Sequence, residues 1–222
     1  MDRQDFDTYA RVKTFNLSIA GAWRQAFDDA VTRAGRPYED IRFLDQGCGD
    51  GKYFQYLVDA GLSPENIHGV EVSKLRVERC RAIGWEHAIY IEKGAKLPYP
   101  DNYFDVANLM EVIEHIPQSY IGGVLDEIRR VLQPAGTLIV STPNYPVKRV
   151  YDVCDAVLHG KWSRFRDDPT HVSFYTHRRL RRLLETYFDR VEARCFKPGF
   201  LHRRIPVKAT MHKMLFLSSG KR

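Results

Sequence analysis

Residues 43–51 read FLDQGCGDG, a glycine-rich stretch that decides how the chain folds. A short apolar run from Ile41 to Leu44 predicts a strand, and apolar residues at helical spacing from Tyr53 to Val58 predict a helix. Glycines between a strand and a helix tolerate positive φ and let the backbone pass close to a bound nucleotide. The stretch therefore indicates either a nucleotide site or a tight turn that binds no ligand.

The spacing of the glycines distinguishes a dinucleotide from other possible cofactors. Gly47, Gly49 and Gly51 follow a G-x-G-x-G pattern, whereas the dinucleotide fingerprint is G-x-G-x-x-G. Asp45 at the strand end would repel a pyrophosphate, but it suits a ligand with an ammonium group and a sulfonium charge. The stretch resembles motif I of the class I S-adenosylmethionine (SAM) methyltransferases. That resemblance implies SAM as cofactor, S-adenosylhomocysteine as product, and contacts from Asp45, Gly47, Cys48, Gly49 and Gly51.

Length and composition bound the class of protein. The 222 residues fit one α/β domain, residues 1–222, that begins with a helical segment over residues 1–38. No apolar run is long enough to span a bilayer and no signal-peptide pattern occurs, so we expect a cytoplasmic protein without a transmembrane segment. The four cysteines lack C-x-x-C spacing, which predicts reduced thiols rather than disulfides or a zinc site.

The net charge of +6 is unevenly distributed along the chain. Residues 1–144 hold 16 Lys and Arg against 21 Asp and Glu, whereas residues 145–222 hold 18 against 7. A basic carboxy-terminal part attracts an anionic substrate, a nucleic acid or an anionic membrane surface. The alternative is a solvated basic face.

An acid also ends the second expected strand, residues 66–72. Glu71 lies 20 residues beyond Gly51, about the separation of a ribose-binding acid from a glycine-rich turn. Ligands of open α/β sheets bind outside the carboxyl ends of the strands, where a carboxylate can accept both ribose hydroxyls. We therefore expect Glu71 and Val72 at the cofactor, although a surface glutamate is the alternative. Ser73 is expected to cap the next helix.

The loop after the third expected strand, residues 87–91, is the candidate adenine site. Residues 97–105 read LPYPDNYFD and resemble the LPFPDxSFD run of the same family. The family usually carries an adenine-binding aspartate four residues before that leucine, where this chain has Lys93. We expect Glu92 or the backbone near Gly94 and Ala95 to replace it.

Further segments resemble the family in the same order, from residue 41 to about 190. Residues 125–144 read LDEIRRVLQPAGTLIVSTPN, and apolar residues at helical spacing run from Leu180 to Phe188. Strands are expected at residues 105–110, 137–141, 191–196 and 208–217. The resemblance implies a Rossmann-like class I methyltransferase fold, with a mainly parallel seven-stranded sheet whose last strand is antiparallel.

The candidate catalytic residues follow the fourth expected strand. Glu111, Glu114 and His115 stand at i, i+3 and i+4, so they would share one face of a helix, and His171 lies further along the chain. Two carboxylates and imidazoles beside a sulfonium suggest a general base with its orienting acid, or a metal site. Met110 and Glu111 would lie on the sulfonium side of the cofactor.

The pattern E-x-x-E-H with a later H-x-x-F-x-T resembles two SAM-dependent groups, the ubiquinone-biosynthesis O-methyltransferases and the small-RNA 3′-end 2′-O-methyltransferases. The second resemblance implies Mg²⁺ or another divalent cation held by Glu111, Glu114, His115 and His171. Without a metal, we expect His115 to be the base, with Glu114 and His171 as further catalytic residues. In the alternative reading, Glu111 caps a turn, His115 packs under the cofactor loop and His171 anchors a loop.

Residues 145–170 are expected to form an insertion or lid over the acceptor pocket, because aromatic and basic residues alternate there. The resemblance implies methyl transfer from SAM to a hydroxyl oxygen of a small-molecule acceptor such as a phenol, a sugar or a lipid-linked metabolite. Two alternatives remain: 2′-O-methylation of RNA, and a SAM-binding regulatory protein without turnover.

Overall fold

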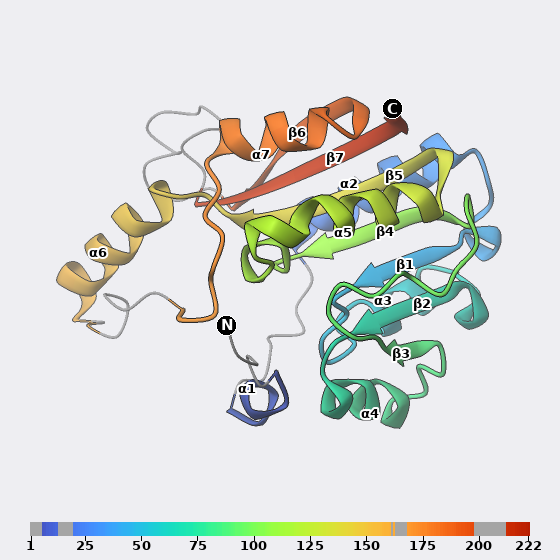
Figure 1. The fold of residues 1–222 in the computed structure, drawn as a ribbon, viewed down its shortest axis with the longest axis horizontal. Coiled ribbons are helices and arrows are strands. Elements are labelled where there is room, and N and C mark those ends of the chain that lie inside the picture. Colours follow the sequence, from blue (N-terminus) through green and yellow to red (C-terminus); the bar gives the residue numbers. More distant parts are fainter. Residues whose placement is uncertain (1–5, 13–19, 161, 163–167, 198–211) are drawn as a thin grey trace.

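A seven-stranded sheet forms the centre of the computed structural model, which describes residues 6–12, 20–160, 162, 168–197 and 212–222 (Figure 1). The strands are β1 (Phe43–Gln46), β2 (Ile67–Glu71), β3 (Ala88–Tyr90), β4 (Phe104–Met110), β5 (Leu132–Pro143), β6 (Phe188–Lys197) and β7 (Lys213–Lys221). Their order across the sheet is β3-β2-β1-β4-β5-β7-β6. The first five strands are parallel, and β7 runs antiparallel to both β5 and β6. The expected sheet is therefore confirmed.

Helices cover both faces of this sheet. They are α1 (Phe6–Val12), α2 (Gly21–Ala34), α3 (Phe54–Asp59), α4 (Lys74–Ala82), α5 (Gln118–Val131), α6 (Val147–His159) and α7 (His177–Glu185), with short 3₁₀ turns η1 (Tyr38–Asp40), η2 (Pro64–Asn66) and η3 (Ile113–His115). Successive strand residues point to opposite faces of the sheet, so each buried strand contributes side chains to the hydrophobic cores on both faces. In β1, for example, Phe43 packs on the side of α2 and α3, and Leu44 on the side of α5 and α7.

Several element boundaries differ from the sequence expectations. The last helix ends at Glu185, and Phe188 begins β6 instead of continuing the helical stripe. β5 begins at Leu132, five residues before the expected start at Thr137, because its first part pairs with Phe104 across an irregularity in the register. Part of the expected last strand, residues 208–211, and residues 161 and 163–167 of the expected insertion lie outside the described residues.

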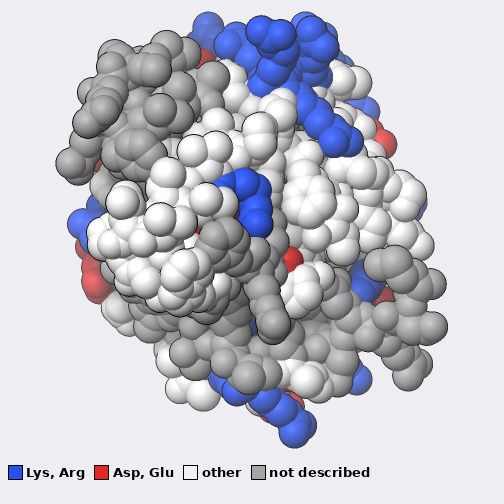
Figure 2. Space-filling view, turned by 90° about the vertical axis from the view of Figure 1, so that its left-hand side faces the viewer, with Lys and Arg blue, Asp and Glu red and all other residues white. Residues whose placement is uncertain are grey.

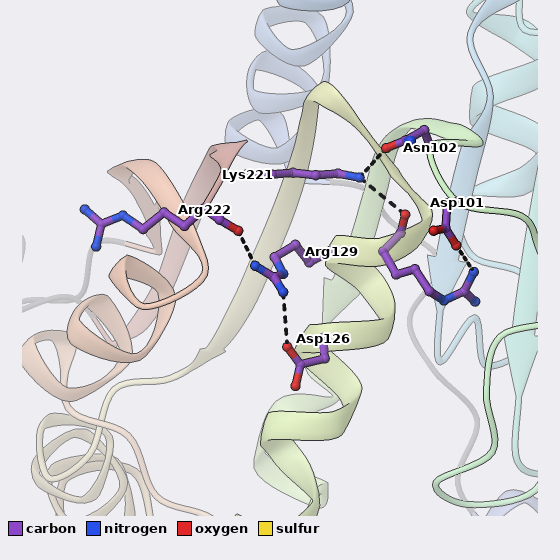
Figure 3. Close-up of a pocket in the computed structure, with 7 residues that line it drawn as sticks. Asp101, Asn102, Asp126, Arg129, Lys221 and Arg222 are labelled. Carbon is purple, nitrogen blue, oxygen red and sulfur yellow. Dashed lines mark hydrogen bonds and ion pairs between the residues drawn. The ribbon is translucent and has the colours of Figure 1, made fainter.

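Hydrogen bonds and ion pairs of charged side chains lie near the amino ends of β4 and β5 (Figure 3). Lys221 of β7 donates to Asn102, just before β4, at 2.6 Å, and Arg129 of α5 donates to the carbonyl of Arg222. Asp126 pairs with Arg129 at 3.7 Å. These residues line a pocket at the end of the strands that is opposite the glycine-rich turn. The candidate site is therefore sought at the carboxyl ends of the parallel strands.

None of the described helices is both long enough and apolar enough to cross a membrane.

Candidate active site

The glycine-rich turn packs directly against the loop that follows β4. Gly47, Gly49 and Gly51 all have positive φ, with values of 78°, 58° and 81°. A Cβ on Gly47 would lie 2.6 Å from a methyl carbon of Val112, closer than side chains approach. Glycine is thus required at position 47 both by its backbone conformation and by this contact.

Glu71 connects the glycine-rich turn to the start of α4. One of its carboxylate oxygens accepts from the backbone N–H of Gly49 at 2.9 Å, and the other accepts from Val72 and Ser73 at 2.8 and 3.1 Å. Burial raises the pKa of Glu71, and the three backbone N–H groups oppose that rise. Ser73 in turn caps α4 by accepting from the N–H of Arg76.

Asp45 is a buried carboxylate at the end of β1, with a side chain only 2% exposed. Its Oδ2 atom has no hydrogen-bond partner among the described residues, and burial raises its pKa to about 7. Asn108, the neighbouring residue on β4, accepts a hydrogen bond from the indole of Trp23 at 3.0 Å. An unpartnered buried acceptor beside a glycine-rich turn fits a ligand with an ammonium group, such as the methionine part of SAM.

Glu111 does not join the other three candidate metal ligands. Its φ is +57°, so the chain turns sharply at the end of β4 and no α-helix includes Glu111 and His115 together. Its carboxylate accepts from Ser141 of β5 at 2.8 Å and from Lys213 of β7. Burial and the charge of Lys213 lower the pKa of Lys52, and the charge of Glu111 partly opposes this change. Lys52 is therefore a second lysine near the carboxylate of Glu111.

Glu114, His115 and His171 form a compact cluster, called the histidine cluster below. Their potential ligand atoms lie within 4.8 Å of one another. The two imidazole rings have centroids 4.9 Å apart, and the carbonyl of Glu114 accepts from Val172 and Ser173 at 2.9 and 3.0 Å. These backbone bonds hold the segment carrying His171 against the loop that follows β4.

Hydrogen bonds orient each side chain of the cluster. The carboxylate of Glu114 is 1% exposed and accepts from the hydroxyl of Thr142 at 2.9 Å. Burial and the charge of Glu111 raise the pKa of Glu114. Nδ1 of His115 lies 3.1 Å from the carbonyl of Thr170. Because a carbonyl only accepts, that nitrogen carries the proton and the basic lone pair of His115 resides on Nε2.

The remaining predicted cofactor residues lie at or just after the carboxyl ends of β1, β3 and β4. Cys48 is buried within the turn, and Met110 ends β4. Gly94 has a φ of +74° in an exposed turn after β3, which the N–H of Ala95 closes by donating to Glu92 at 3.0 Å. Tyr120 at the start of α5 lies beside Gly94.

Several contacts near the site join distant parts of the chain and could not be predicted from the sequence. Asp7 of α1 accepts from the hydroxyl of Ser73 at 2.5 Å and from the N–H of Leu75 at 3.2 Å. Arg79 of α4 joins the carbonyl of Ala10 to the carboxylate of Asp50, at 3.1 and 3.0 Å. α1 thus contacts α4 and is linked through Arg79 to the glycine-rich turn, and no local pattern indicates this. Lys213, which pairs with Glu111 from 102 residues away, was missed for the same reason.

Comparisons with known proteins agree with this geometry. The methyltransferase domain family model matches residues 20–187. A ubiquinone biosynthesis O-methyltransferase of Chelativorans is 30% identical over 52% of this chain and 46% of its own length. A ubiquinone/menaquinone biosynthesis C-methyltransferase of Paraburkholderia phytofirmans is 38% identical over 72% of this chain and 68% of its own. The chain thus spans about half to two thirds of the length of these relatives.

A similar fold occurs in a SAM-dependent methyltransferase of Archaeoglobus fulgidus, with a TM-score of 0.60 and 17% identity over 90% of this chain and 94% of that one. Three observations lead to one assignment. They are the order of the strands, the glycine-rich turn with acids at the ends of β1 and β2, and the match of the family model to residues 20–187. The chain belongs to the class I SAM-dependent methyltransferase family.

Proposed function

We propose that this protein transfers a methyl group from SAM to a hydroxyl oxygen of a small-molecule acceptor. The observation that carries the choice of oxygen is the histidine cluster, because a hydroxyl must lose a proton during transfer and a carbonyl-bound His115 is poised to take it. The similarity to a ubiquinone biosynthesis O-methyltransferase supports the same choice. The similarity to a C-methyltransferase leaves carbon as the competing acceptor atom.

Residues at the strand ends would hold the cofactor. Asp45 offers a buried, unpartnered carboxylate oxygen to the ammonium of the methionine part, and Glu71 offers its Gly49-bonded oxygen to a ribose hydroxyl. The glycines have no side chain and adopt positive φ, so the backbone of the turn can approach the ligand closely. When bound, SAM supplies a methyl group on a sulfonium, which is an activated leaving group.

The protein's own chemical task is proton removal and alignment. As the new oxygen–carbon bond forms and the sulfur–carbon bond breaks, the hydroxyl proton passes to Nε2 of His115, which becomes an imidazolium. The neighbouring carboxyl group of Glu114 stabilises that charge when it is ionised. Tyr145 bonds to Nδ1 of His171 at 2.9 Å and orients the second ring. General-base catalysis of this kind contributes roughly 10²–10⁴-fold to the rate.

Residues 145–170, which include α6, would cover the acceptor. Tyr145 ties this segment to the histidine cluster, and Thr170 at its other end accepts from His115. The two ends of the segment therefore both contact the proposed catalytic residues.

The test measures S-adenosylhomocysteine production from SAM with phenolic and catecholic acceptors, and identifies the product methyl as O-linked or C-linked by NMR. His115→Ala is expected to lower kcat by roughly 10²-fold or more while leaving S-adenosylhomocysteine binding unchanged. His87→Ala, at an exposed position before β3, is the matched control and should retain activity. A C-linked methyl, or an unaffected His115→Ala, would contradict the proposal.

A second candidate function is cation-assisted 2′-O-methylation of RNA, favoured by the same cluster as a donor set of one carboxylate and two imidazoles. The hydrogen bonds at both Nδ1 atoms resemble those that orient metal-binding histidines, and a bound divalent cation would lower the pKa of an acceptor hydroxyl. Against it, burial raises the pKa of Glu114 and so disfavours the ionised ligand. Calorimetric titration with Mn²⁺ or Mg²⁺, on the wild type and on His171→Ala, separates the two candidates.

A further inference from the structure

α6 exposes apolar side chains at the end of the molecule where it projects from the sheet (Figure 1). Only Asp152 and Ala156 of its 13 residues are buried. Leu158 is 74% exposed, and Trp162, two residues beyond Gly160, is 65% exposed. We call the following exposed set the α6 apolar surface: Val150, Val153, Val157, Leu158 and Trp162. Val150, Val153 and Val157 stand at i, i+3 and i+7 and so share one side of α6, and an exposed apolar set of this kind indicates an interaction site.

Neither acid of α6 is among its fully exposed residues. Asp152 is buried and pairs with Lys148 at 2.6 Å, and Asp155 pairs with His159 at 2.9 Å. Every exposed residue of α6 is apolar except His159. The helix therefore presents an apolar side that would not repel an anionic partner.

Basic residues lie on the same side of the molecule. α7 carries four exposed arginines, of which Arg179 bonds to Gln118 and Arg181 pairs with Glu185. Arg178 and Arg182 stand at i and i+4 on one face, and neither forms an ion pair within the described ranges. Figure 2 views the molecule from the α6 end and shows Lys and Arg side chains gathered along the top of this face.

We propose that the α6 apolar surface, together with Arg178 and Arg182, docks onto an anionic lipid bilayer. An amphipathic helix with aliphatic residues and a tryptophan on one side inserts at the level of the lipid headgroups, and nearby arginines bind the anionic headgroups. RNA fits less well, because four of the five residues of the α6 apolar surface are aliphatic and Trp162 alone among them offers a ring for a base to stack on. This inference goes beyond the proposed methyl transfer and does not require it.

Tyr145, two residues before α6, connects the amino end of this helix to the histidine cluster. Phe174, 46% exposed, packs its ring edge-on against Tyr145 with 4.8 Å between centroids. Tyr145 in turn bonds to His171. Docking would therefore bring the bilayer close to the proposed catalytic residues, and an apolar acceptor could reach them without crossing bulk water.

The experiment is co-sedimentation of the full chain with large vesicles of phosphatidylglycerol and phosphatidylcholine in equal amounts, and with vesicles of phosphatidylcholine alone. Leu158→Glu removes apolar burial and adds repulsion, and should lower the partition coefficient at least roughly tenfold. Arg182→Glu should lower it about tenfold at low salt and less at high salt. The controls are Ile83→Glu, just after α4, and Arg81→Glu, on α4, which make the same chemical changes at exposed positions near the other edge of the sheet. Their binding to vesicles should stay within about twofold of the wild type.

Selective binding of the wild type to anionic vesicles, lost in the α6 and α7 variants but not in the controls, supports the proposal. The absence of vesicle binding, or equal loss in the controls, overturns it. If light scattering shows a dimer that Leu158→Glu dissociates, the surface binds a second copy of the chain and the proposal is overturned. If single-stranded RNA displaces the vesicles and Arg182→Glu prevents this, the surface binds RNA and the proposal is also overturned. Leu158→Ser replaces Leu158→Glu if circular dichroism shows that the glutamate variant unfolds. Calorimetry with S-adenosylhomocysteine, which should bind the wild type and the α6 and α7 variants equally, keeps this result separate from the cofactor site.

Discussion

The carboxylate of Glu71 accepts a hydrogen bond from the backbone N–H of Gly49 at 2.9 Å. The acid that ends β2 therefore shapes the glycine-rich turn after β1, in addition to its proposed contact with the ribose. Because Glu71 also accepts from Val72 and Ser73, three backbone donors depend on one buried side chain. Ligand binding and folding stability are thus linked at this residue.

Glu71→Gln should lower both quantities together. An amide cannot accept from donors on both of its ends, so at least one buried N–H loses its partner, at a cost of about 1–3 kcal/mol in the free energy of unfolding. S-adenosylhomocysteine affinity should fall at least roughly tenfold, because the turn and the ribose contact are both altered. Urea denaturation and calorimetry measure the two effects. Glu78→Gln, at an exposed position on α4, should change neither.

Asp45 should make stability and cofactor binding depend on pH in opposite directions. Burial raises its pKa to about 7 in the folded protein, from 3.8 when it is exposed, so the folded state holds the proton more tightly than the unfolded chain. The free energy of unfolding should therefore decline as pH rises from about 4 to about 7, by up to about 4 kcal/mol.

The cofactor ammonium favours the ionised carboxylate, so affinity for S-adenosylhomocysteine should rise over the same pH range, with release of a proton on binding below about pH 7. Calorimetry in buffers of different ionisation enthalpy detects that proton. Asp45→Asn should abolish the proton release and remove the contribution of Asp45 to the stability change, while buried Glu71 and Glu114, whose pKa values are also raised, keep theirs. A proton release that survives this substitution would assign the titration to another group.

Gly47→Ala should destabilise the protein more than an alanine at another glycine with positive φ. At position 47 the new methyl group meets Val112 at 2.6 Å, whereas at Gly35, with a φ of +65°, it meets no atom within 4 Å. Gly35→Ala should cost only about 1 kcal/mol for the backbone conformation, and Gly47→Ala about 2–4 kcal/mol. Adding Val112→Ala should recover part of the difference. Thermal denaturation of the three variants checks this, and equal costs at the two glycines would contradict the contact.

The pair formed by Lys213 and Glu111 should contribute a modest coupling energy. Both side chains are about 30% exposed, so water screens their attraction. A double-mutant cycle with Lys213→Met and Glu111→Gln should give about 0.5–1 kcal/mol in the free energy of unfolding. The exposed pair of Arg181 and Glu185 serves as the reference and should give about 0.3–0.5 kcal/mol. A coupling no larger than the reference would mean that Lys213 does not hold Glu111.

What the sequence predicted well depends on contacts that are close along the chain. The positive φ of the glycines in residues 47–51 and the cap at Ser73 depend on nearby residues of the chain. The sheet was predicted from the resemblance of segments between residue 41 and about residue 190 to the class I methyltransferases. Glu111 was different, because its left-handed conformation turns the chain where helical spacing was assumed. Its partner Lys213 lies 102 residues away, and periodicity carries no information about such a pairing.

The position of β7 has a consequence for the order in which the sheet is completed. β7 follows β6 in the chain, yet it lies between β5 and β6, so β6 has no place in the sheet until β7 has been synthesised. Until then the edge of β5 stays open, and open edges recruit strands from other chains. Ribosomes that stall before Lys213 should therefore release an aggregation-prone nascent chain, with Glu111 still lacking its lysine partner.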